Sequence, residues 1–232
     1  MQIHGLQKLT LLDYPGHMAA TVFTGGCNFR CPYCHNSELV LRPESVPMIP
    51  EAEVFAFLKA RAKMLEAVCV TGGEPTLQKD LPEFLAKVRS LGYRVKLDSN
   101  GQAPSVLAGL LQNKLVDYVA MDIKNCRERY GETIGVPNFR TDAVEASVQL
   151  LMRSGIQYEF RTTVCKELHD TESIKRIGEW IAGARHYYLQ PYRESDQVMH
   201  KGVFHAPERE ELIAWKELLA KTISAVDIRG LD

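Results

Sequence analysis

The sequence predicts an α/β protein built as a partial (β/α)6 barrel. Short apolar, β-branched runs alternate six times with stretches of helical periodicity along the 232 residues. Six successive β-then-α units form a parallel sheet covered by helices. Right-handed crossovers then allow either an open doubly wound sheet or a partial barrel. We favour the barrel because the unusual polar motifs fall at the predicted strand ends, where parallel α/β folds place their chemistry.

The predicted elements follow one another in a regular order. The expected strands are residues 18–24, 67–71, 94–98, 118–123, 158–164 and 187–191. The expected helices are residues 50–64, 81–91, 103–113, 142–154, 172–182 and 207–224. Asp142 and Thr171 are positioned to cap helix N-termini, and Gly92 and Gly155 are positioned to end helices.

Composition limits the classes to which the chain can belong. Its 28 Lys and Arg and 29 Asp and Glu give a formal net charge of −1, so we expect neither nucleic acid nor membrane as a partner. No stretch approaches the ~18 apolar residues of a membrane span, and residues 1–8 do not resemble a signal peptide. Six cysteines without a secretion signal indicate a reducing compartment, hence the cytoplasm. We expect a single domain, 1–232, with residues 1–17 as an N-terminal extension that packs on the core.

Three cysteines follow the first predicted strand with the spacing Cys27-x3-Cys31-x2-Cys34. Three thiolates can hold three of the four irons of a cubane iron–sulfur cluster, which leaves one iron for a ligand that is not protein. Such an open iron suits a chelating substrate or cofactor. A structural zinc site made by the three cysteines and His35 is the alternative, although zinc modules usually present two separated ligand pairs.

The second predicted strand ends in Gly72, Gly73 and Glu74. A glycine pair at a strand end lets a ligand meet the backbone directly, and Glu74 could accept an ammonium group. Alone, this segment would be interpreted as a turn. In the cysteine loop, Tyr33 offers an aromatic face, for which core packing and ligand stacking are equally good interpretations.

Charged residues end the next strands. Asp98 and Ser99 follow the third strand and Asp122 and Lys124 the fourth, so two carboxylates could hold a cation or orient an ammonium group. Lys124 is a donor for a carboxylate. Arg161 lies within the fifth strand among apolar neighbours and needs either an internal or a ligand carboxylate. Together with an open iron and an aromatic face, these groups match an amino acid that bears an adenosyl group, S-adenosylmethionine.

With these residues, the chain resembles the radical S-adenosylmethionine (radical SAM) superfamily, whose cluster loop has the form Cys-x3-Cys-x-aromatic-Cys. Residues 27–34 match this loop, and residues 72–75 match the superfamily's Gly-Gly-Glu-Pro motif. Within the superfamily the chain is similar to the glycyl-radical-enzyme activating group, and most of all to activators of anaerobic ribonucleoside-triphosphate reductase. The segments that carry this similarity are residues 5–8, 13–16, 31–36, 98–101, 122–124 and 190–193.

The resemblance implies a TIM-like radical SAM core and a [4Fe-4S] cluster held by Cys27, Cys31 and Cys34. It implies reductive cleavage of S-adenosylmethionine to methionine and a 5′-deoxyadenosyl radical, which takes a hydrogen from a glycine of a partner glycyl radical enzyme. A flavodoxin- or ferredoxin-type protein is the implied electron donor, and Asp98 and Asp122 are implied to hold a monovalent cation. The implied cofactor contacts are Tyr33, Gly72, Gly73, Glu74, Asp98, Ser99, Asp122, Lys124 and Arg161.

Two alternatives stay open besides a glycyl-radical activator. A small-molecule enzyme similar to 7-carboxy-7-deazaguanine synthase is one, because residues 72–78 also fit its motif, although its cluster loop more often ends Cys-Asp-Thr than Cys34-His35-Asn36. A zinc-binding interaction domain is the other. Arg193 stands where pyruvate formate-lyase activators often have histidine, which disfavours that lyase as the partner. The remaining cysteines, Cys69, Cys126 and Cys165, are too scattered to suggest a second cluster, although the last two leave an auxiliary role open.

Overall fold

The computed structural model describes residues 1–230, in which eight strands form one sheet in the order β1-β2-β3-β4-β5-β6-β7-β8. β1 runs antiparallel to β2, and every other neighbouring pair is parallel. The strands are β1 (Ile3–Thr10), β2 (Ala19–Thr24), β3 (Ala67–Gly72), β4 (Arg94–Ser99), β5 (Tyr118–Asp122), β6 (Gln157–Val164), β7 (His186–Pro191) and β8 (Ala225–Ile228). The α-helices are α1 (Ser37–Leu41), α2 (Glu51–Arg61), α3 (Leu81–Ser90), α4 (Pro104–Gln112), α5 (Tyr130–Thr133), α6 (Asp142–Arg153), α7 (Thr171–Trp180) and α8 (Arg209–Leu219). Short 3-10 helices are η1 (Pro43–Ser45), η2 (Pro75–Leu77) and η3 (Arg127–Arg129).

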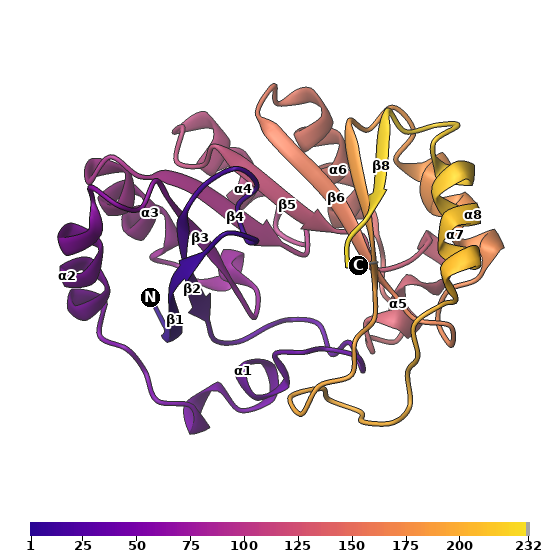
Figure 1. Ribbon diagram of the computed structural model, residues 1–232, viewed down its shortest axis with the longest axis horizontal. Helices are drawn as coiled ribbons and strands as arrows, with labels where there is room; N and C mark the ends of the chain where they lie inside the picture. The colour runs from indigo at the N-terminus through magenta and orange to yellow at the C-terminus, as the bar shows by residue number, and fades with distance from the viewer. Residues whose placement is uncertain (231–232) are drawn as a thin grey trace.

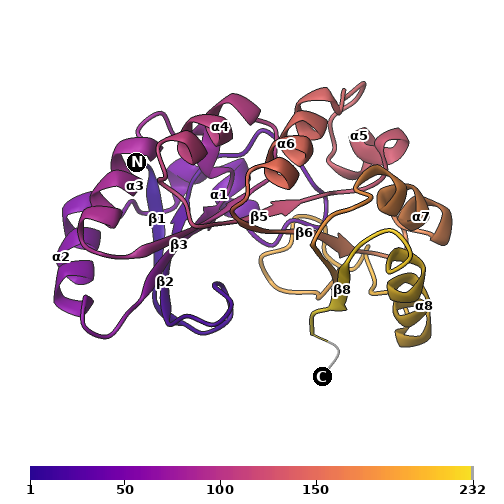
Figure 2. The same cartoon turned by 90° about the horizontal axis from the view of Figure 1, so that it is seen from above.

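The strand order decides between the two architectures that the sequence leaves open. A doubly wound sheet reverses its strand order and carries helices on both faces. Here the strands follow one another in chain order, so successive right-handed crossovers place the helices on the same face. Figure 2 shows the sheet as an arc, with α2, α3, α4, α6, α7 and α8 along its outer side and β1 and β8 at its ends. The predicted α/β fold with a partial barrel is confirmed.

Side-chain alternation along the central strands gives the sheet an apolar outer face and a polar inner face. On β4, Val95 and Leu97 are fully buried in the core beneath the helices, whereas Lys96 and Asp98 occupy the alternate, inward positions. β5 and β6 repeat the pattern. Their inward positions near the carboxyl ends include Asp122 and Arg161, which are paired residues in the parallel register. The register therefore brings charged side chains from neighbouring strands to similar heights inside the barrel.

The structure extends the predicted sheet at both edges. Residues 1–17, expected as an extension packing on the core, include β1, which is a strand of the sheet itself and buries Ile3 completely. At the other edge, β8 follows α8 and pairs with β7, although the prediction had the helix at residues 207–224 as its last element. Among residues 1–230, none of the helices has the length and apolar character that crossing a bilayer requires.

The predicted helix boundaries lie within three residues of the observed ones, except that α8 ends at Leu219 rather than at residue 224, and the predicted caps differ. The N-cap of α7 is Asp170 rather than Thr171, and its carboxylate accepts a hydrogen bond from the amide of Ser173 at 2.7 Å. The N-cap of α6 is Thr141, so Asp142 is the first helical residue. Both predictions were one residue late, because sequence alone does not show which of two adjacent polar residues leaves the helical conformation. Two glycines with positive φ, Gly92 and Gly155, follow α3 and α6 as predicted.

Candidate functional site

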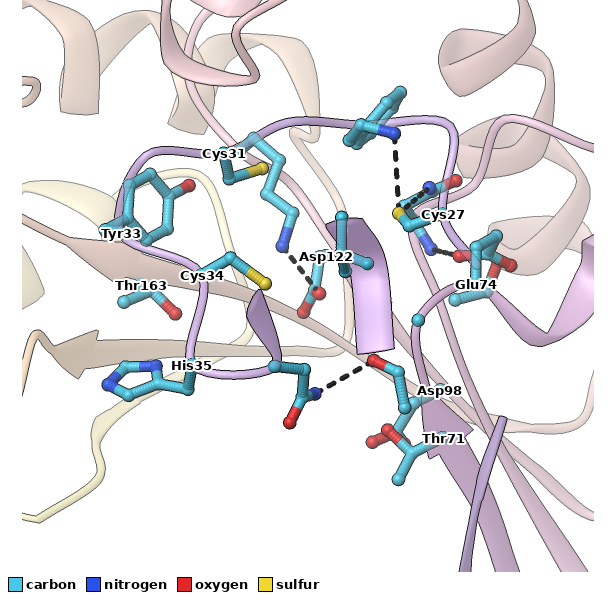
Figure 3. A pocket seen from close by; sticks show the side chains of 18 of the residues that line it. Cys27, Cys31, Tyr33, Cys34, His35, Thr71, Glu74, Asp98, Asp122 and Thr163 are labelled. Carbon is cyan, nitrogen blue, oxygen red and sulfur yellow. Dashed lines mark hydrogen bonds and ion pairs between the residues drawn. The ribbon is translucent and has the colours of Figure 1, made fainter. Parts of the chain in front are cut away.

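A cavity of about 180 Å³ opens at the carboxyl ends of the parallel strands. Its walls are formed by the loop after β2, the turn after β3 and the last residues of β4 and β5, together with residues of β6 and β7 (Figure 3). All the site residues predicted from the sequence line this cavity: Cys27, Cys31, Tyr33, Cys34, Gly72, Gly73, Glu74, Asp98, Ser99, Asp122, Lys124 and Arg161.

The cysteine loop, residues 27–34, is held against the mouth of the barrel by backbone hydrogen bonds. The amide of Gly26 donates to the carbonyl of Leu39 at 2.7 Å, and the amide of Arg30 donates to Ile134 O at 2.8 Å. The loop between β7 and α8 crosses to the other side of the same segment (Figure 1), where the amide of His200 donates to Pro32 O at 3.0 Å. The position of the three cysteines is therefore determined by segments far away in sequence.

Burial keeps the three thiols protonated when no metal is bound. It raises the pKa of Cys27 to about 11 and that of Cys31 to about 12, and it raises the pKa of Cys34 as well. Thiolates are the form that binds metal, so iron would have to displace these protons. The amide of Phe29 already donates to Cys27 Sγ at 3.4 Å, a contact that favours a thiolate at this position.

The donor set suits an iron–sulfur cluster better than a single zinc ion. Figure 3 shows Cys27 across the cavity from Cys31 and Cys34. Within residues 1–230, no three His, Cys, Asp or Glu side chains converge closely enough to hold one metal ion. The fourth ligand of the zinc alternative is also engaged elsewhere, because His35 Nε2 lies 2.6 Å from the carbonyl oxygen of Arg193. A cubane separates its ligands around a bulky core, so three spread thiols fit it.

Close backbone packing explains the glycine pair after β3. A Cβ on Gly73 would lie 1.9 Å from the carbonyl oxygen of Gly26. That carbonyl accepts a hydrogen bond from the amide of Glu74 at 2.8 Å. The turn after β3 is thus bonded directly to the residue that precedes Cys27, and only glycine fits at position 73.

Glu74 is buried, with 1% of its surface exposed, and its carboxylate accepts four hydrogen bonds. Oε1 accepts from the amide and hydroxyl of Thr76 and from the hydroxyl of Ser99. Oε2 accepts from the amide of Asn100 at 2.6 Å. Burial raises the pKa of Glu74 in spite of these donors. Glu74 therefore lines the cavity and also has a framework role, because its carboxylate joins the turn after β3 to the end of β4.

The strand-end charges form one connected network. Arg161 Nε lies 2.5 Å from Asp122 Oδ1, and Arg161 Nη2 lies 3.1 Å from Asp98 Oδ2. Lys124 Nζ lies 2.8 Å from Asp122 Oδ2. Burial alone would raise the pKa of Asp122, but the charges of Arg161 and Lys124 outweigh it and hold that pKa far below its usual value. The sequence left open whether Arg161 pairs with an internal carboxylate or with that of a ligand. In the structure it pairs with the internal carboxylates of Asp98 and Asp122.

Tyr33 lies on the cavity wall but is mainly a core residue. Its side chain is 3% exposed, and its ring packs edge-on against Phe204, with centroids 6.1 Å apart. Its hydroxyl is buried with no hydrogen-bond partner among the described residues. Core packing is thus the interpretation that the observed contacts support.

The cavity also contains residues that sequence reasoning did not select. Asn36 Nδ2 donates to the carbonyl of Gly72 at 2.9 Å, and Asn100 Nδ2 donates to Asn28 Oδ1 at 2.8 Å. Asn36 and Asn100 belong to the segments 31–36 and 98–101 that carry the family resemblance. Their place in these segments could have identified them as site residues. The others are Phe29, Val40, Thr71, Thr163 and Gln190, and His35 was considered only as a zinc ligand. Cys69, Cys126 and Cys165 are buried and do not line the cavity.

The sequence and the fold of this chain are similar to those of known proteins. A sequence model described as the Radical SAM superfamily matches residues 21–178. A Methanocaldococcus jannaschii protein, provisionally named a glycyl-radical enzyme activating enzyme, is 31% identical over 99% of this chain and 96% of its own length. A second protein of that organism with the same provisional name is 26% identical over 89% of this chain and 78% of its length. The crystal structure of a domain of pyruvate-formate lyase-activating enzyme from Bacteroides vulgatus superposes with a TM-score of 0.58 at 17% identity, covering 71% of this chain and 99% of that domain.

Proposed function

The chain belongs to the radical SAM superfamily of enzymes, and from this premise we propose that it generates a glycyl radical on a partner enzyme. The observation that carries the proposal is the cavity itself, which the three thiols of the cysteine loop and the charged strand ends line together. The similarity to a provisionally named activating enzyme extends over 99% of the chain, which supports the same class of reaction.

Cys27, Cys31 and Cys34 are the residues that would hold a [4Fe-4S] cluster. Bound together, the cluster and S-adenosylmethionine supply the electron and the cleavable sulfonium that start radical chemistry. Three cysteines would leave one iron of the cluster without a protein ligand. The glycines at positions 26 and 73 keep the loop close to the turn after β3, so that cluster and amino acid would share one wall.

The charges of the cavity suit a zwitterionic amino acid. Lys96, Arg161 and Lys124 exceed Asp98 and Asp122 by one positive charge on the side of β4 to β6. A ligand carboxylate is attracted to this side, where the two pocket-lining cations can donate to it. In the turn after β3, next to the end of β4, the buried Glu74 and the backbone of residues 72–73 offer acceptors for an ammonium group. We propose these two groups of residues as the binding sites of the carboxylate and ammonium groups of S-adenosylmethionine.

The open side of the barrel supports a protein substrate. β1 and β8 are the two edges of the sheet and do not pair with each other among the described residues. A protein loop that carries the reactive glycine could enter between them and reach the cavity. The resemblance of the sequence motifs favours anaerobic ribonucleoside-triphosphate reductase as this partner, with a flavodoxin- or ferredoxin-type protein as electron donor.

The experiment that tests the proposal mixes reduced, cluster-loaded protein with S-adenosylmethionine and the candidate reductase under anaerobic conditions. We expect a glycyl-type doublet in the electron paramagnetic resonance spectrum, absent when the radical glycine of the reductase is changed to alanine. A doublet obtained only with a different glycyl radical enzyme would support the proposed reaction and identify that enzyme as the partner in place of the reductase. No doublet with any glycyl radical enzyme, together with turnover of a deazaguanine precursor, would overturn the proposal in favour of a small-molecule enzyme.

A further inference from the structure

The two strand-end carboxylates are fully engaged by basic side chains of this chain. Asp98 Oδ1 is paired with Lys96 Nζ, and Asp98 Oδ2 lies 3.1 Å from Arg161 Nη2. Asp122 Oδ1 lies 2.5 Å from Arg161 Nε, and Asp122 Oδ2 lies 2.8 Å from Lys124 Nζ. Each of the four carboxylate oxygens thus has its own cationic nitrogen. An inorganic cation at these oxygens would have to share them with those nitrogens, next to positive charges.

The charge balance of this group opposes a further cation. Three cations and two anions leave one net positive charge among side chains that are 2% to 24% exposed. Charges at such depth are poorly screened by solvent, so this group of five side chains by itself repels another positive charge and attracts a carboxylate. The family resemblance implied Asp98 and Asp122 as ligands of a monovalent cation; in the structure, Arg161 bridges these two carboxylates.

Lys96 differs from the other two cations in its position. Arg161 and Lys124 line the cavity and can turn toward a ligand, but Lys96 does not line it. Its side chain is 2% exposed and lies beneath Asp98, with Nζ 3.9 Å from Cys69 Sγ and 5.9 Å from the centre of the Tyr118 ring. A bound carboxylate that drew Arg161 away from Asp98 would leave Lys96 in place. Lys96 is therefore the permanent counter-charge of Asp98.

We infer that Lys96, with Arg161, serves as the built-in counter-cation of the strand-end carboxylates, so that this protein binds S-adenosylmethionine without an inorganic monovalent cation. Lys96 is a positioning residue in this scheme, because it acts on the ligand only through Asp98. The inference rests on the proposed function, which makes S-adenosylmethionine the ligand of the cavity.

The test measures equilibrium binding of S-adenosylmethionine to cluster-loaded, unreduced protein, in which the ligand is not cleaved. Isothermal titration calorimetry is performed in potassium, sodium and tetramethylammonium chloride at equal ionic strength. For the wild type we expect dissociation constants that agree within about twofold in the three salts. A rise of about tenfold or more when the alkali cations are left out would overturn the inference.

Substitution of Lys96 supplies the complementary measurement. Lys96→Met leaves Asp98 Oδ1 without a cationic partner, so we expect weaker binding in tetramethylammonium chloride that potassium or sodium restores by about tenfold. Lys96→Arg keeps the charge and should stay insensitive to the salt, as should Lys87→Met, which removes an exposed lysine. If Lys96→Met folds and its dissociation constant for S-adenosylmethionine depends on alkali cations no more than that of the wild type, Lys96 is not the counter-cation of Asp98. Should Lys96→Met not fold, the wild-type comparison decides alone, and absence of binding in every salt would refute the proposed function instead.

Discussion

The backbone amide of Asn100 donates a hydrogen bond to Glu74 Oε2 at 2.6 Å, which joins the end of β4 to the turn after β3. The side chain of Asn100 continues this connection to Asn28 in the cysteine loop. One buried carboxylate thereby fixes the relative positions of three segments that are separated by 26 and 72 residues in sequence. This relationship makes Glu74 important for the shape of the cavity as well as for its charge.

Substitution of Glu74 is expected to destabilise the fold and to loosen the cavity. Glu74→Gln keeps one oxygen that can accept from Thr76 and Ser99, but it turns the new NH2 group toward the amide of Asn100, so this buried donor loses its acceptor. Leaving a buried donor unsatisfied costs about 1–3 kcal/mol. Urea unfolding should show this loss, whereas Glu44→Gln on the surface should stay within about 0.5 kcal/mol of the wild type. Equal unfolding free energies for the two variants would contradict the framework role.

The six cysteines are expected to separate into two groups. Alanine at position 27, 31 or 34 should abolish the bound iron and the visible absorbance of anaerobically reconstituted protein, because each thiol is one of only three cluster ligands. Alanine at position 69, 126 or 165 should retain about four irons per chain, since these cysteines do not line the cavity. Iron and zinc analysis of the same samples checks both groups. Tight binding of one zinc ion per chain in place of iron would favour a zinc-binding domain over a cluster enzyme.

A single methyl group at position 73 is expected to displace the cysteine loop. Gly73→Ala would set its Cβ 1.9 Å from Gly26 O, so the two segments must separate and the bond from Glu74 to Gly26 must break. We expect lower stability and a reduced iron content. Gly109→Ala is the matched control, because a Cβ there meets nothing within 4 Å in α4 and should stabilise the helix by up to about 1 kcal/mol. Normal cluster content in Gly73→Ala would show that the close approach is not required.

Acid is expected to weaken the protein partly through Asp122. Arg161 and Lys124 hold the pKa of Asp122 far below the value of 3.8 that it has when unfolded. The unfolded chain therefore takes up this proton first, and the stabilisation present above the unfolded pKa is lost as the pH falls. The unfolding free energy of the wild type should exceed that of Asp122→Asn most at neutral pH, and the difference should shrink below about pH 4. A difference that did not change with pH would mean that the ion pairs do not set the charge of Asp122.

The central strands and helices could be predicted because each has a local signal. β3 is a short apolar run, β4 alternates apolar with charged residues, and α3 between them has a clear apolar face and Gly92 after its end. β1 was missed because an edge strand with partly exposed residues lacks a continuous apolar run. β8 and α5 have only four residues each, too few for periodicity to show. Their conformations depend on contacts with distant segments.

By itself, the sequence determined the chemistry of the site. Three cysteines within one loop, glycines at a strand end and charged residues after the next strands identify the donors, and parallel strands ensure that their ends meet. The tertiary structure alone decided how these charges are paired. Asp98 and Arg161 are 63 residues apart, and Asp122 and Arg161 are 39 apart, so only the register of β4, β5 and β6 brings them within hydrogen-bond distance. Local patterns carry no information about register across a parallel sheet, because helices of variable length separate the strands. Burial then makes the pairing stable, since an unpaired charge inside the barrel would be too costly to retain.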